Sequence, residues 1–163
     1  MIRRWVMVGL LAACGCGNGL DVPDGASPPA NVTVSGAVSG TFHAIVHSTY
    51  NLASAKDETV ISVLTAANPG LGIDSFAIDA LVAGIPQVKH YGERDAQMLG
   101  AVTLNDGRTF QSTVNSQNRL DITAVTVPMG NPDGSRAYTL SGTAAGAASE
   151  HNSSDTIFFQ VDF

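Results

Sequence analysis

Short runs in which apolar and polar residues alternate fill most of this chain after residue 30, and turn-forming residues separate them. Alternation with a period of two puts successive side chains on opposite faces, which is the pattern of a half-buried β-strand. Glycine, asparagine, aspartate and proline interrupt the runs at short intervals, as in antiparallel all-β domains. The candidate strands cover residues 32–35, 42–46, 59–64, 73–82, 87–91, 98–104, 109–114, 120–127, 137–142 and 156–163.

These runs predict an all-β fold, an antiparallel β-sandwich of immunoglobulin-like or jelly-roll-like type with about nine or ten short strands. A small barrel is hard to distinguish from a sandwich by this pattern. The clearest hairpin joins residues 98–104 to 109–114 through Asn105-Asp106-Gly107, a turn that tolerates positive φ. The Ser-Gly pairs at Ser35-Gly36, Ser39-Gly40 and Ser141-Gly142 predict bulges or bends.

Segment 73–83 fits two periods. Phe76, Ala77 and Ala80 match a helical repeat, whereas Phe76, Ile78 and Ala80 match a strand repeat. Because the runs around it are strand-like, we expect a strand here.

The first fourteen residues have a different pattern. Arg3 and Arg4 precede nine apolar or small residues, 5–13, and the segment Leu11-Ala12-Ala13-Cys14 follows on from that run. A basic start, an apolar stretch and small residues before a cleavage site form a secretory signal peptide. The stretch is too short to cross a bilayer, which takes about 20 residues.

Leu11-Ala12-Ala13-Cys14 resembles the lipobox of bacterial lipoproteins. In that family the cysteine receives a diacylglycerol thioether and becomes the mature N-terminus, so the resemblance implies lipidation of Cys14. Gly15 stands where an aspartate would retain some lipoproteins in the inner membrane, which implies the outer membrane, on its periplasmic face or at the cell surface. The length and pattern of the rest resemble small β-sandwich lipoproteins of bacteria.

The resemblance divides the chain into a lipoprotein signal peptide (1–13), a lipidated disordered tether (14–30) and a β-sandwich domain (31–163). The tether is rich in glycine and proline, so it buries too little surface to offset the entropy lost on ordering. Cys14 and Cys16 are the only cysteines, and we therefore expect no disulfide in the domain.

The side chains capable of chemistry form no familiar catalytic pattern. The sequence contains no Gly-x-Ser-x-Gly elbow, His-Glu-x-x-His helix or P-loop. On a strand, His43 and His47 would lie on one face about 13 Å apart, too far to share one metal ion. His90 and His151 are isolated in the sequence. We therefore expect no catalytic residues and no metal site.

Carboxylates give three further candidates. The turns at 105–107 and 131–134 carry oxygens that suit Ca²⁺, but both are ordinary turn sequences. Glu93 and Asp95, near Tyr91, are a close acidic pair, which we expect to lie in a solvated loop because a sequence shows no facing geometry.

Function follows from these expectations. The net charge of −6 excludes a nucleic-acid partner, which needs a basic surface. We expect a lipid-anchored cell-envelope protein with a non-catalytic binding or structural role, no cofactor, and an envelope protein as partner. A small-ligand binder for Ca²⁺, lipid or glycan is the alternative, and a hydrolase with an unrecognised site is a weaker one. The sequence identifies no ligand-binding residues.

Overall fold

The computed structural model describes residues 29–51, 58–65, 67–92, 95–112, 118–126 and 136–163. Its strands are β1 (Ala30–Gly36), β2 (Gly40–Asn51), β3 (Glu58–Thr65), β4 (Ile73–Ala83), β5 (Lys89–Tyr91), β6 (Ala96–Leu104), β7 (Thr109–Ser112), β8 (Arg119–Thr126), β9 (Arg136–Ala137), β10 (Thr139–Glu150) and β11 (Thr156–Asp162). One 3₁₀ turn, η1 (Pro69–Leu71), precedes β4. None of the residues described belongs to a helix with the length and hydropathy needed to span a bilayer.

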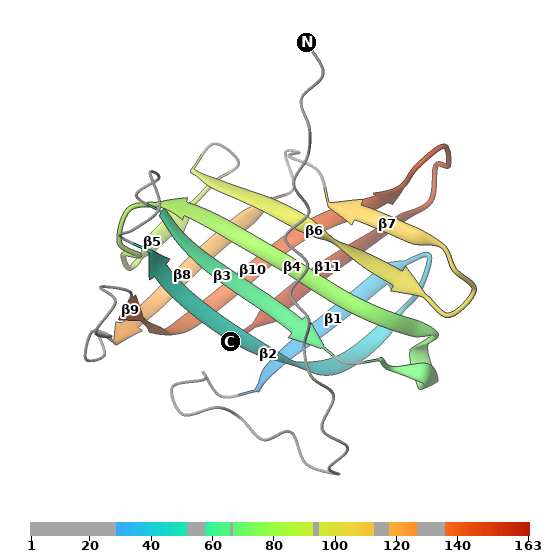
Figure 1. The fold of residues 1–163 in the computed structure, drawn as a ribbon, viewed down its shortest axis with the longest axis horizontal. Helices are drawn as coiled ribbons and strands as arrows, with labels where there is room; N and C mark the ends of the chain where they lie inside the picture. Colours follow the sequence, from blue (N-terminus) through green and yellow to red (C-terminus); the bar gives the residue numbers. More distant parts are fainter. Residues whose placement is uncertain (1–28, 52–57, 66, 93–94, 113–117, 127–135) are drawn as a thin grey trace.

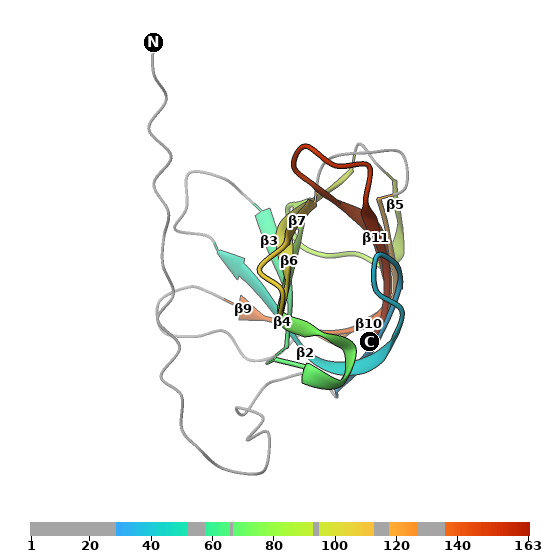
Figure 2. The same ribbon diagram turned by 90° about the vertical axis from the view of Figure 1, so that its right-hand side faces the viewer.

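Eight of these strands close into an antiparallel β-barrel in the order β11-β1-β2-β3-β4-β6-β7-β10. The ring is complete because β10 pairs with both β7 and β11. Figure 1 shows the strands crossing the molecule from side to side, and Figure 2 shows them arranged around a common core. All of the pairings within the ring are antiparallel.

The expected sandwich is therefore wrong, although the all-β class is right. A sandwich needs two separate sheets, whereas here one sheet closes on itself. The physical reason is that closure depends on the pairings of β11 with β1 and of β10 with β7, which join segments distant in the sequence. Alternation along each strand marks its buried face equally in either architecture.

The ring forks at β10. Residues 148–150 of β10 pair with β7, whereas residues 139–145 pair with β8 along the same edge. The short strand β5 pairs with β8, and β9 pairs with the end of β2. The fork therefore adds β8 and β5 to one side of the barrel.

Several local predictions are confirmed. Segment 73–83 is a strand, β4, paired on both sides. The predicted hairpin joins β6 to β7, and Gly107 has a φ of 88° in its turn. The ladder between β8 and β10 shifts register between Ser141 and Gly142, as expected for a bulge. β10, however, continues to Glu150, well beyond the run that ended at residue 142.

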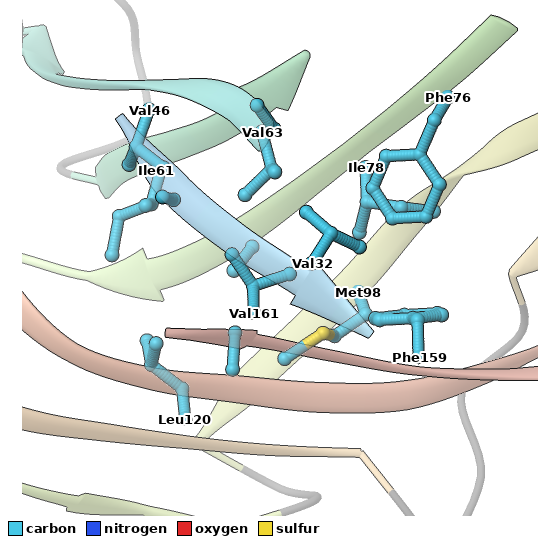
Figure 3. Packing of buried hydrophobic residues seen from close by; sticks show 14 of the residues in the cluster. Val32, Val46, Ile61, Val63, Phe76, Ile78, Met98, Leu120, Phe159 and Val161 are labelled. Carbon is cyan, nitrogen blue, oxygen red and sulfur yellow. The ribbon is translucent and has the colours of Figure 1, made fainter. Parts of the chain in front are cut away.

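Apolar side chains fill the interior of the barrel. The ring of Phe76 meets those of Phe42 and Phe159 edge to face, with centroids 5.4 and 5.8 Å apart. Figure 3 shows Val32, Met98 and their neighbours converging from several strands. Eight strands enclose a space just wide enough for side chains. The inward face of this barrel is therefore a packed core.

Candidate functional site

Three of the sequence-based candidates lie wholly or partly outside the described residues. They are Cys14, the turn at 131–134, and Glu93 of the acidic pair. Asp95, the other member of that pair, is exposed. The structure therefore does not test these predictions.

His43 and His47 lie on the outer side of β2, while Phe42 and Val46 point into the core. This is the arrangement that the alternation predicted. Within the residues that the structure covers, no three His, Cys, Asp or Glu side chains come together in a group able to hold a metal ion. His151 is exposed beside the end of β10.

His90 is not isolated, contrary to the expectation from the sequence. It lies opposite Asp121 across the β5–β8 pair, and His90 Nδ1 is 2.5 Å from Asp121 Oδ1. The side chains remain 63% and 39% exposed. Sequence reasoning missed this pair because 31 residues separate its members, and only the fork in the barrel brings β5 beside β8.

His90 and Asp121 do not form a catalytic triad with the nearest hydroxyl. The next residue across the sheet is Thr143, which lies opposite Asp121 on β10. A hydrolytic triad places the histidine between the carboxylate and the hydroxyl, because the ring must accept the proton of the nucleophile. Here the carboxylate lies between the histidine and the hydroxyl, so the pair does not activate Thr143.

A second row on the opposite wall has the three residue types of a triad. His47 faces Ser62 and Ser62 faces Asp79 across β2, β3 and β4. Here the serine lies in the middle, and no hydrogen bond joins these three side chains among the interactions of the described residues. The row therefore also lacks the histidine–carboxylate contact that orients a catalytic base.

The turn at 105–107 is held by a salt bridge in place of a cation. Asp106 accepts hydrogen bonds from the Arg108 backbone N–H at 3.0 Å and from Arg108 Nε at 2.8 Å. Arg108 Nη1 also donates to Asp155 at 3.2 Å. These bonds, that of the backbone N–H first, hold the pKa of Asp106 below its ordinary value. Since the guanidinium already neutralises the carboxylates, the turn does not suit Ca²⁺.

A groove of about 310 Å³ lies on the outer surface next to the fork in β10. The ring of Phe158 is 43% exposed there. Besides this ring, the lining contains the buried ring of Phe159 and residues that are polar or small, among them Thr33, Ser35, Arg119, Ala145 and Gln160. Hydroxyls, an amide, a guanidinium and one aromatic ring are the groups with which proteins bind a polar ligand that has an apolar face. Sequence reasoning missed this groove, because its lining comes from four strands.

The wall formed by β2, β3, β4 and β6 presents apolar side chains to the outside among polar ones. Leu64 and Leu99 are 38% and 39% exposed. We call this surface the apolar wall, and its outward apolar residues include Ile45, Val60, Leu64, Ala77, Leu81 and Leu99. A second groove, of about 290 Å³, adjoins the wall beside Ile45 and Leu64.

The chain matches no protein-family model, and comparison with curated protein sequences and with solved structures gives no significant match to either.

Proposed function

We propose that this chain is a lipid-anchored, non-catalytic protein of the bacterial cell envelope, and that its barrel binds an envelope protein through the apolar wall. The single observation that carries the proposal is the exposure of Leu64 and Leu99 on neighbouring parts of one wall. Large apolar side chains that gather on one exposed surface mark sites of protein interaction. The adjoining groove beside Leu64 gives this surface a concave edge for a partner side chain.

The centre of the apolar wall supplies specificity. The polar row of His47, Ser62 and Asp79 crosses it between apolar neighbours. Polar groups within an apolar contact select a partner, because a wrong partner leaves them buried without hydrogen bonds. In neither of the two rows described above does a histidine lie between a carboxylate and a hydroxyl, as it would in a catalytic triad. This supports binding as the role of the barrel.

Lipid attachment at Cys14 is tested by intact mass and by labelling with palmitate. The proposal expects a mature chain that begins at Cys14 and carries acyl groups, with membrane fractionation lost in Cys14→Ala. The matched control is Cys16→Ala, which removes the neighbouring thiol and keeps the anchor. An unmodified Cys14, or a Cys14→Ala protein that still fractionates with membranes, contradicts the anchor.

Partner binding is tested with a photo-crosslinking residue placed at Leu99 in the lipidated protein in cells. The expected product is one discrete protein adduct that mass spectrometry identifies. The control places the same residue at the exposed Gln160 on β11, three strands from β6 around the ring. Equal adducts at both sites, or none at Leu99, contradict docking on the apolar wall.

The groove at Phe158 favours a second candidate function, which is glycan binding. A sugar ring stacks on an exposed aromatic side chain while its hydroxyls bond to Thr33 and Gln160, and Arg119 selects a carboxylate on the sugar. Titration with an acidic oligosaccharide such as oligogalacturonate tests this candidate. Binding that is lost in both Phe158→Ala and Arg119→Ala supports it, whereas unchanged binding or no binding contradicts it.

A further inference from the structure

The loop between β4 and β5, residues 84–88, carries the two most exposed large aliphatic side chains among the described residues. Ile85 is 47% exposed and Val88 is 62% exposed. They lie three positions apart in a loop at one end of the barrel, where β4 ends beside β5 (Figure 1). Two large exposed aliphatic side chains therefore lie in one short loop, and we call them the apolar tip.

This loop is held in a fixed shape. Its first carbonyl, of Gly84, accepts a hydrogen bond from Thr59 Oγ1 at 2.7 Å. The backbone N–H of Gln87 donates to the hydroxyl of Tyr91 at 2.8 Å. Pro86, between the two exposed side chains, is buried. The loop therefore presents Ile85 and Val88 outward at little further cost in conformational entropy.

A basic side chain follows the apolar tip. Lys89 is exposed, and its amine lies 4.4 Å from the centre of the Tyr91 ring. An aliphatic tip followed by a lysine matches the layers of a bilayer surface, where acyl chains lie beneath phosphate groups.

The antiparallel pairing places this loop at the same end of the barrel as the start of β1. Ala30, the first residue of β1, lies opposite Ala44 of β2, and β2 then runs on to Asn51. Asn51 faces Glu58, which faces Ala83 at the end of β4. Measured along the direction of β2, the loop thus lies about seven residues, or about 23 Å, beyond the level of Ala30.

The length of chain before Ala30 fits this offset. Fifteen residues, 15–29, separate Cys14 from Ala30. Fifteen residues reach at most about 50 Å when fully extended, which exceeds the offset of about 23 Å. The segment is therefore long enough for a lipid at Cys14 to lie in the plane of the loop tip.

We infer that loop 84–88 inserts Ile85 and Val88 into the surface of the phospholipid bilayer to which Cys14 is anchored. This inference rests on the proposed lipid anchor. Insertion fixes the orientation of the barrel, because it adds a second point of attachment to the lipid at Cys14. The apolar wall and the groove at Phe158 then face sideways from the membrane, where they are open to a partner.

The test uses the lipidated protein in phosphatidylcholine vesicles, with Cys16→Ser and an environment-sensitive fluorophore on Val88→Cys. Insertion predicts a blue shift of the emission and loss of intensity when the vesicles contain brominated lipid. The matched control carries the fluorophore on Leu99→Cys, an exposed aliphatic position on the side of the barrel, and is expected to show neither change. Adding Ile85→Asp to the Val88 probe abolishes both signals, whereas adding Leu64→Asp leaves them.

The test distinguishes failure of the lipid anchor from failure of the inference about the loop. Intact mass shows whether Cys14 carries lipid, which tests the anchor independently of the probe. In protein whose mass confirms the lipid, a Val88 signal equal to that of Leu99 overturns the inference about the loop. A blue shift that grows with protein density and ignores brominated lipid places Val88 against a second copy of the chain, and it also overturns the inference.

Discussion

The ring of Phe76 on β4 meets the ring of Phe159 on β11 edge to face, with centroids 5.8 Å apart, although these strands occupy opposite positions in the eight-strand ring. Phe76 also contacts Phe42 on β2. The Phe76 side chain thus connects β4 with β2 and β11 through the interior of the barrel. A closed sheet without such contacts would have to hold water or a ligand in its interior.

Phe76→Ala is expected to lower the free energy of unfolding by about 3–5 kcal/mol, because it removes a buried ring and leaves a cavity. Urea unfolding followed by far-UV circular dichroism measures the change. The control is Phe158→Ala, a similar truncation of a ring that is 43% exposed, and we expect a loss below about 1 kcal/mol. Equal losses in the two variants would contradict a core organised around Phe76.

The sequence predicted the strands well and their closure poorly. Alternation is a local property, so it located β3, β4, β6 and β11 within a few residues. The barrel depends on β11 pairing with β1, across almost the whole domain. No local pattern encodes such a pairing. The end of β10 was missed for a different reason, since alanine and glycine at 144–148 have low β propensity and only the flanking strands hold them extended.

The candidate site was less predictable than the fold. The sequence placed His43 and His47 correctly, because their orientation follows from the period of one strand. It treated His90 as isolated, because Asp121 reaches it only through the branch of β8 and β5 from β10. The groove at Phe158 was missed for the same reason, since its lining residues become neighbours only when the barrel closes.

Gly100→Ala is expected to be severely destabilising, by more than about 3 kcal/mol. Gly100 has a φ of 142°, and an added Cβ would lie 2.0 Å from the carbonyl oxygen of Ala77 on the paired strand β4. The substitution therefore forces β4 and β6 apart. The control is Gly107→Asn, in the β6–β7 turn, where φ is 88° and no atom lies within 4 Å of the added carbon. Asparagine tolerates positive φ, so we expect a loss of about 1 kcal/mol or less by the same unfolding measurement.

The carboxyl group of Asp106 is expected to titrate below its ordinary pKa. The backbone N–H of Arg108, followed by its guanidinium, stabilises the charged form in the folded protein. Since the folded pKa is below the unfolded one, the contribution to stability is present above the unfolded pKa and is lost as the pH falls through the folded pKa. Carbon-detected NMR titration measures the midpoint directly. In Arg108→Ala the backbone N–H remains, so the midpoint should rise only part of the way, and a complete return would contradict the order of these causes.

Removal of the His90–Asp121 pair is expected to leave both the fold and the binding surface intact. The two side chains are 63% and 39% exposed, so solvent screens their attraction and the pair contributes at most about 1 kcal/mol to stability. His90→Ala and Asp121→Asn should therefore unfold close to the midpoint of the unmodified protein and keep the crosslinked adduct at Leu99, because the pair lies away from the apolar wall on β8 and β5. A variant that folds normally and still loses the adduct would show that the partner contacts this side of the barrel, and the assignment of binding to the apolar wall would then fail.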